Sequence, residues 1–111
     1  MASRYSFHHP EMVEGVVLWD AYPADDMSSS SLPVSMIHRS NQAGDPPPDY
    51  QEVLFRLPPQ TTFTPLKGGQ HLNFGSFIPG RIYRDEPPPE LEPDIQMSLA
   101  AGYTIEFLAG I

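Results

Sequence analysis

Few residues in this chain of 111 have the type and spacing that chemistry requires. His8 and His9 are adjacent, and adjacent side chains on a regular element point in different directions, so the pair is not predicted to hold a metal. The chain has no cysteine, which removes thiolate metal sites, disulfides and a thiol nucleophile. We therefore expect no cofactor and no metal.

The other candidate catalytic residues are scattered. His38 and His71 are isolated in the sequence, and each is predicted to be a surface or strand histidine. Asp25 and Asp26 precede a run of serines, which favours a solvated loop or a helix cap over a catalytic pair of carboxylates. The sequence contains no Gly-x-Ser-x-Gly elbow, no His-Glu-x-x-His helix and no Walker phosphate loop. We predict that the protein is not an enzyme, and the alternative is a cluster of Asp, Glu and His from distant segments.

The charge balance excludes several classes of partner. Six basic and 14 acidic residues give a net charge of −8. Nucleic-acid binding and docking on an anionic membrane both need a basic face, so neither is expected. No apolar run approaches the roughly 20 residues that span a bilayer, and no apolar segment follows the N-terminus as in a secretory signal. We predict a cytoplasmic protein that is not secreted.

The most specific local pattern is the run of prolines that ends at Tyr50. Consecutive prolines favour a polyproline II helix, which binds in aromatic grooves at a low entropic cost. Tyr50 offers a flat ring and a hydroxyl to a neighbouring pocket, and one helical turn later Val53 lies beside it. The predicted partner-binding residues are Pro46, Pro47, Pro48, Tyr50 and Val53.

The segment Pro47-Pro48-Asp49-Tyr50 resembles the PPxY motif of WW-domain ligands. Such motifs are found in the late domains of viral matrix and Gag-type structural proteins, which recruit ubiquitin ligases that carry WW domains during budding. The resemblance covers residues 46–53 and implies a virion-associated, non-enzymatic structural protein with a WW-domain partner. The chain departs from that family in lacking a basic membrane-binding face.

A different interpretation of the same prolines needs no WW partner. A proline-rich linker that ends at the start of a helix gives the same residues. The protein would then be a small subunit whose proline-rich segments become ordered in a homo-oligomer or a larger assembly.

The expected fold is mostly β, a small sandwich or partial barrel with one short helix and long proline-rich loops. Strands are predicted at residues 13–20, 32–38, 61–64, 71–74, 95–99 and 103–108. The turn at residues 67–70 is expected to join two of them as a hairpin. Residues 50–57 place Tyr50, Val53, Leu54 and Leu57 on one helical face, with a strand as the rival interpretation.

The chain is expected to form a single small domain over residues 1–111. Within it, residues 23–49 are interpreted as a flexible Ser/Pro-rich linker or loop. Residues 85–94 are interpreted as an acidic, proline-rich connection, because like charges and prolines both favour an extended chain.

Overall fold

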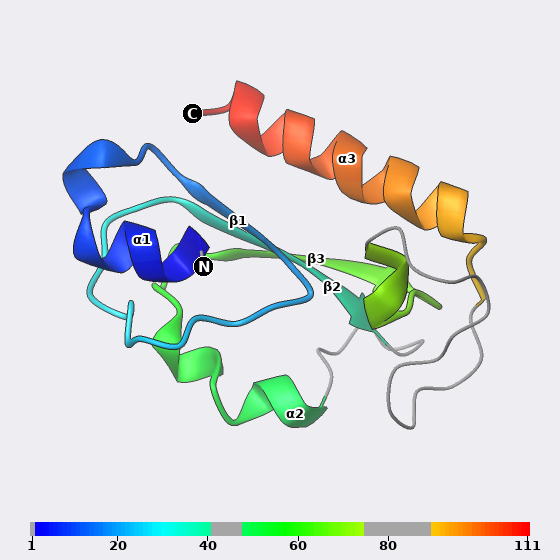
Figure 1. The fold of residues 1–111 in the computed structure, drawn as a ribbon, viewed down its shortest axis with the longest axis horizontal. Helices are drawn as coiled ribbons and strands as arrows, with labels where there is room; N and C mark the ends of the chain where they lie inside the picture. The colour runs from blue at the N-terminus through cyan, green and yellow to red at the C-terminus, as the bar shows by residue number, and fades with distance from the viewer. Residues whose placement is uncertain (1, 41–47, 75–89) are drawn as a thin grey trace.

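The computed structural model of the chain describes residues 2–40, 48–74 and 90–111. Its strands are β1 (Val16–Trp19), β2 (Val34–Ser40) and β3 (Thr62–Lys67). Its helices are α1 (Ala2–His8), α2 (Pro48–Gln51) and α3 (Pro93–Ala109), with short 3-10 helices η1 (Pro10–Met12), η2 (Leu54–Arg56) and η3 (His71–Phe74). Figure 1 shows α3 on one side of the sheet and α2 on the other.

The three strands form one parallel sheet in the order β1-β2-β3. Val16 pairs with Val34, and Ser35 pairs with Thr62. The expectation of a mostly β sandwich or partial barrel is therefore wrong, because the molecule has a mixed α/β fold. Parallel strands need crossover connections instead of tight hairpin turns: residues 20–33 join β1 to β2 without a helix, and the connection from β2 to β3 contains α2 and η2.

The positions of the three strands agree with the sequence patterns. β1 and β2 overlap the β-branched and aromatic runs predicted at residues 13–20 and 32–38. β3 continues through Pro65 to Lys67 instead of ending at the proline. It can do so because β3 is an edge strand, where one row of backbone N–H groups has no ladder partner to lose.

Three of the predicted strands are helical. Residues 71–74 form η3, so the turn at Gly68, with φ of 76°, does not close a hairpin. Residues 95–99 and 103–108 belong to the 17-residue helix α3. Pro93 occupies the first turn of α3, where proline is favoured because its missing N–H has no intrahelical partner.

Residues 50–57 form no strand, and instead of one continuous helix they are only partly helical. They divide between α2 and η2, with a turn between the two. Tyr50 and Leu57 are buried, while Val53 and Leu54 are half-buried.

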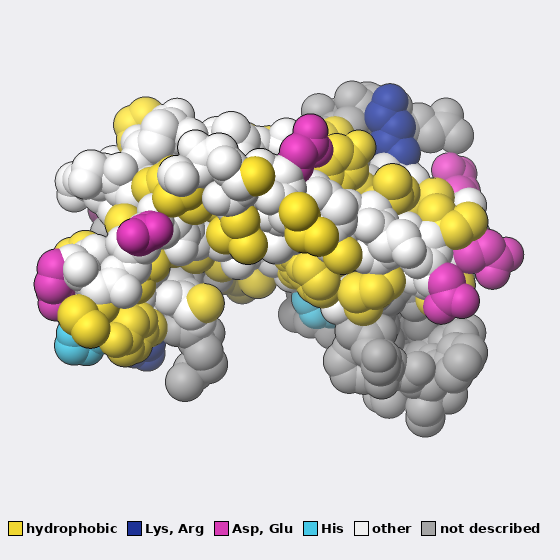
Figure 2. Space-filling view, turned by 90° about the horizontal axis from the view of Figure 1, so that it is seen from above, with side chains coloured by type: hydrophobic (Ala, Val, Ile, Leu, Met, Phe, Trp, Pro, Cys, Tyr) yellow, Lys and Arg dark blue, Asp and Glu magenta, His cyan; other side chains and the backbone are white. Residues whose placement is uncertain are grey.

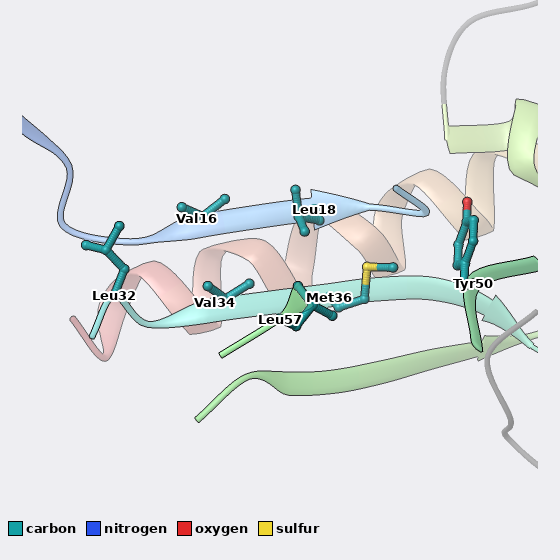
Figure 3. Packing of buried hydrophobic residues seen from close by; sticks show 7 residues of the cluster. All are labelled: Val16, Leu18, Leu32, Val34, Met36, Tyr50 and Leu57. Carbon is teal, nitrogen blue, oxygen red and sulfur yellow. The ribbon is translucent and has the colours of Figure 1, made fainter. Parts of the chain in front are cut away.

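One face of the sheet carries the larger apolar cluster (Figure 3). Alternate side chains of β1 and β2 point toward α2 and η2, as the two-residue period of a strand requires. The members of this cluster, which we call the α2-side cluster, are Val16, Leu18, Leu32, Val34, Met36, Tyr50 and Leu57.

The opposite face of the sheet packs against α3 through a smaller cluster. Ile37, Leu66 and Ala100 are buried there, and Trp19 is packed against them. The Trp19 Nε1–H donates to Thr104 Oγ1 at 2.9 Å, which fixes α3 on the sheet. Figure 2 shows apolar side chains along α3 among polar and acidic ones, and the exposed large apolar residues of this helix are Ile95, Leu99, Tyr103, Ile105 and Leu108.

Two further findings concern predictions about the whole chain. In the part of the chain that the structure describes, no helix has the length and apolar character needed to cross a membrane. Residues 23–40, which lie in the expected linker, include the central strand β2 and the buried residues Met27 and Leu32. Residues 41–47 and 85–89 lie outside the described residues.

Candidate active site

Asp20, His71 and Arg39 come together at one edge of the sheet. Because all three strands run in the same direction, their carboxyl ends lie at the same edge. Asp20 follows β1, Arg39 is next to last in β2, and η3 with His71 follows β3 after a short turn. This edge is where open α/β sheets commonly bind ligands.

The backbone of Asp20 adopts an uncommon conformation. Its φ of 49° is the only positive value at a non-glycine residue among those that the structure describes. A residue held in this left-handed region costs about 1–3 kcal/mol, and Asp tolerates it better than most residues do. The Asp20 N–H donates to the Ile37 carbonyl at 2.7 Å, which holds the strained turn against β2. Such strain is common at functional sites and motivates a functional interpretation of this turn.

The Asp20 carboxylate is fully buried and accepts several hydrogen bonds. The Arg39 backbone N–H donates to Oδ1 at 3.0 Å, and the Arg39 guanidinium Nη1 donates to Oδ2. His71 Nδ1 lies 2.7 Å from the same Oδ2 atom. A buried charge is tolerated only when it is paired and hydrogen-bonded, and these contacts meet that requirement.

The contact with Asp20 determines how the His71 ring is used. An ionised carboxylate can only accept, so the His71 Nδ1 must carry the hydrogen that it shares with Asp20. In a neutral imidazole, the other nitrogen, Nε2, then has the lone pair that accepts a proton. The His71 side chain is 32% exposed, whereas Asp20 is not exposed at all. The pair therefore joins a buried carboxylate to a ring that solvent can reach.

Helix α3 holds the loop that carries His71. The Gln96 side chain is fully buried. Its Nε2 donates to the Gln70 carbonyl at 2.8 Å, and its Oε1 accepts from the Gln70 N–H at 2.9 Å. A Cβ atom added to Gly69 would lie 3.1 Å from the same Oε1, so the loop passes close to the helix. These contacts fix the backbone of the residue immediately before His71.

Tyr50 supports the turn at Asp20 from the α2 side. Its hydroxyl donates to the Asp20 carbonyl oxygen, and Arg39 Nη1 lies 3.5 Å from the same hydroxyl. The Arg39 Cζ atom is 5.3 Å from the centre of the Tyr50 ring, and the Tyr22 ring makes an edge contact at 5.2 Å. The Tyr50 side chain is thus a structural neighbour of the Asp20–His71 pair.

The predicted partner-binding residues are not presented together. Tyr50 is only 3% exposed, so its ring cannot enter a groove on another protein without local opening of the domain. Pro48 begins α2 and Val53 is half-buried, while Pro46 and Pro47 lie outside the described residues. Binding of this segment to a WW domain stays a prediction that these observations do not test.

The remaining candidates occupy separate places. His8 ends α1 and His9 follows it, both near the N-terminus and far from His71 in sequence. Asp26 Oδ1 accepts from the Ser28 N–H at 2.9 Å, and hydrogen bonds from the Ser28 side chain and backbone lower the pKa of Asp26. Asp25 pairs loosely with Arg4 at 3.9 Å.

A hollow of about 500 Å³ lies elsewhere, at the amino end of β1. Its lining is mainly aliphatic and consists of Ala2, Tyr5, Val13, Gly15, Val16 and Val17. Asp20 and His71 are not among the lining residues. Its lining has one polar side-chain group, the Tyr5 hydroxyl, so it does not bring several polar groups together around a substrate, and the Asp20–His71 pair lies at the other end of β1.

A family model described as "Alpha/beta hydrolase family" matches residues 1–85 of the 111-residue chain. The match includes all three strands and both members of the Asp20–His71 pair. The chain belongs to the alpha/beta hydrolase family. No curated protein and no solved structure gives a significant match.

The family match overturns the predicted function. The expectations of a non-enzymatic, viral matrix-like structural protein and of a mostly β chain are both wrong. The match indicates a hydrolase-like fold and points to an enzyme. Asp20 was not among the predicted site residues, and His71 was predicted to be an isolated histidine. The available signal was that Asp20 ends the predicted strand 13–20 and His71 comes after the predicted strand 61–64 and its turn, since residues at the carboxyl ends of two strands meet when the strands are parallel.

Proposed function

We propose that the protein is a hydrolase of acyl esters in which His71 is the general base and Asp20 orients it. The observation that supports the proposal is the 2.7 Å contact between His71 Nδ1 and the buried Asp20 Oδ2, at the carboxyl edge of the parallel sheet. At the same edge, the backbone of Asp20 adopts the strained positive φ of 49°. Family membership adds that hydrolysis is the class of reaction to test.

The proposed chemistry uses both nitrogens of the His71 ring. Nε2 removes a proton from the attacking oxygen as that oxygen bonds to the ester carbonyl carbon. The resulting imidazolium is stabilised by Asp20 through the Nδ1–H hydrogen bond. His71 then returns the proton to the leaving alkoxide as the ester C–O bond breaks, which gives an acid and an alcohol.

The nucleophile is a separate question. The printed sequence contains no Gly-x-Ser-x-Gly segment, so water is the first nucleophile to consider for this chain. General-base assistance alone contributes about 10²–10⁴-fold. A fluorophosphonate probe tests for a serine nucleophile, because it forms a stable adduct with an activated serine that peptide mass spectrometry can locate.

The direct test is hydrolysis of p-nitrophenyl acetate by the full chain and three variants. Asp20→Asn keeps the shape of the side chain but removes its charge, and His71→Gln removes the base. We expect Asp20→Asn and His71→Gln each to lose most of the rate acceleration, by at most about 10⁴-fold. His8→Gln is the matched control, because His8 is an exposed histidine at the end of α1.

The proposal is rejected if the wild-type chain does not accelerate the reaction. It is also rejected if His71→Gln and His8→Gln behave alike, since any histidine on the surface would then account for the rate.

A further inference from the structure

We propose that Arg39 is a positioning residue that balances the charge of Asp20 and thereby leaves His71 neutral. The inference rests on the proposed function, because it concerns the state in which His71 works as a base. It assigns to Arg39 a role that the pairing of Asp20 with His71 does not itself require.

The geometry places two donors on one oxygen atom. The Arg39 guanidinium and His71 Nδ1 both contact Asp20 Oδ2. Arg39 also donates its backbone N–H to Oδ1, so it reaches both oxygens of the carboxylate. The side chains of Arg39 and Asp20 are 11% and 0% exposed, so water does little to screen this ion pair.

A buried carboxylate needs one balancing positive charge, and two groups at Asp20 are able to supply it. Arginine is permanently charged, whereas histidine is charged only when it is protonated. With Arg39 in place, Asp20 is balanced without a second proton on His71. The carboxylate then orients the ring by a hydrogen bond and leaves Nε2 free of a proton.

Without the guanidinium charge of Arg39, His71 would have to supply the positive charge that balances Asp20. The buried carboxylate would then hold a proton on the ring, because an opposite charge nearby favours the charged form of a group. A protonated His71 has no lone pair for an incoming proton. The same contact that orients the base would thus inactivate it.

Among the described residues, Glu90 lies against the turn that precedes η3, because its N–H donates to the Gly68 carbonyl at 2.9 Å. The element that packs on η3 is α3, whose first turn contains Asp94 and is preceded by Glu92. Both side chains are exposed, so solvent screens their effect on His71. From the α2 side, the Tyr50 hydroxyl contacts Asp20 and Arg39.

The test is ¹⁵N nuclear magnetic resonance of histidine side chains in the full chain near neutral pH. The four histidines are separated by comparison with His71→Gln. Ring nitrogen shifts distinguish a neutral ring with its proton on Nδ1 from an imidazolium. We expect the neutral form in wild type and in Arg39→Lys, which keeps the charge.

In Arg39→Gln, we expect the ratio of charged to neutral His71 to rise on the order of tenfold or more. The double variant Asp20→Asn/Arg39→Gln removes both charges and should return His71 to the neutral form. This variant also covers the case in which Arg39→Gln alone fails to fold, since no lone charge is then left buried.

The outcomes separate the two proposals. An imidazolium in the wild-type protein, or an unchanged ring in folded Arg39→Gln, overturns the role of Arg39. The expected spectra without any ester hydrolysis support the charge balance and reject the hydrolase proposal. Hydrolysis with unchanged spectra keeps the hydrolase and removes only the role of Arg39.

Discussion

Strand β2 contributes to two buried regions of opposite character. Its first half contributes Val34 and Met36 to the α2-side cluster (Figure 3), which consists of buried apolar side chains together with the Tyr50 ring. Its end contributes Arg39 to the polar contacts around Asp20. Apolar packing is spread over many weak contacts, whereas the polar region depends on a few partners that must all be present. The comparison separates residues that maintain the fold from those that hold a chemical arrangement.

The largest effect on stability is expected at Arg39. Arg39→Gln leaves the buried Asp20 carboxylate without its guanidinium partner, which costs about 3–5 kcal/mol. Urea unfolding followed by circular dichroism measures the loss. The double variant Asp20→Asn/Arg39→Gln should lose less than Arg39→Gln alone. A larger loss in the double variant would mean that the two charges act independently.

The next effect tests the apolar side of the comparison. Met36 is fully buried in the α2-side cluster, so Met36→Ala should cost about 2–5 kcal/mol through lost burial and a cavity. Met12→Ala is the matched control, because Met12 is 70% exposed and should change stability by less than about 0.5 kcal/mol. If His71 also changed its protonation state in Met36→Ala, the two regions would not be separate.

A smaller effect is expected where the two regions meet. Tyr50 belongs to the α2-side cluster through its ring and to the polar region through its hydroxyl. Tyr50→Phe keeps the ring but leaves the Asp20 carbonyl without that donor, at a cost of about 1–3 kcal/mol. Thermal unfolding measures it, with the exposed Tyr5→Phe as the control. Equal behaviour of the two variants would show that the hydroxyl contributes nothing.

The smallest effect lies outside both regions, at Asp26. Hydrogen bonds from the Ser28 side chain and backbone lower the pKa of Asp26 from its ordinary value of 3.8, and Arg56 adds a weaker attraction. A lowered pKa in the folded state stabilises the protein above pH 3.8, and that contribution is lost as the pH falls through the lowered value. Ser28→Ala should reduce this acid dependence. Because Asp26 is exposed, solvent screens its charge and the effect should be small. If the acid unfolding curve of Ser28→Ala shifted as far as that of Arg39→Gln, this explanation would be contradicted.

The positions of the strands were predictable, but their directions were not. Short β-branched runs identify strands locally, whereas parallel or antiparallel pairing depends on what fills the connections. The glycines at residues 68 and 69 indicated a hairpin turn. In the structure, Gly69 instead lies against Gln96, and this long-range contact sends the chain toward η3.

Helix α3 shows why the strands predicted at residues 95–99 and 103–108 were wrong. Tyr103, Ile105 and Phe107 alternate as they would in a half-buried strand, while apolar residues occur on every side of the helix. Ile105 is 68% exposed, so its hydrophobicity does not indicate burial. Pro93 was the local sign of a helix start, but no single pattern within residues 95–108 outweighed the alternation.

The candidate site could be predicted only in part. Asp20 and His71 each follow a strand that the sequence identifies, but they are far apart in the chain. Antiparallel hairpins in a mostly β fold would not have placed Asp20 and His71 at the same edge of the sheet. Parallel pairing brings them within hydrogen-bonding distance, so the error in topology caused the error in function.

The position of Trp19 has a practical consequence. It is the chain's single tryptophan, it immediately precedes Asp20, and it is hydrogen-bonded to Thr104 of α3. Indole emission depends on polarity and on hydrogen bonding, so the protein contains an intrinsic fluorophore at the junction of helix and sheet. One optical signal can therefore follow the docking of α3 while a substrate or inhibitor is titrated at the neighbouring residues.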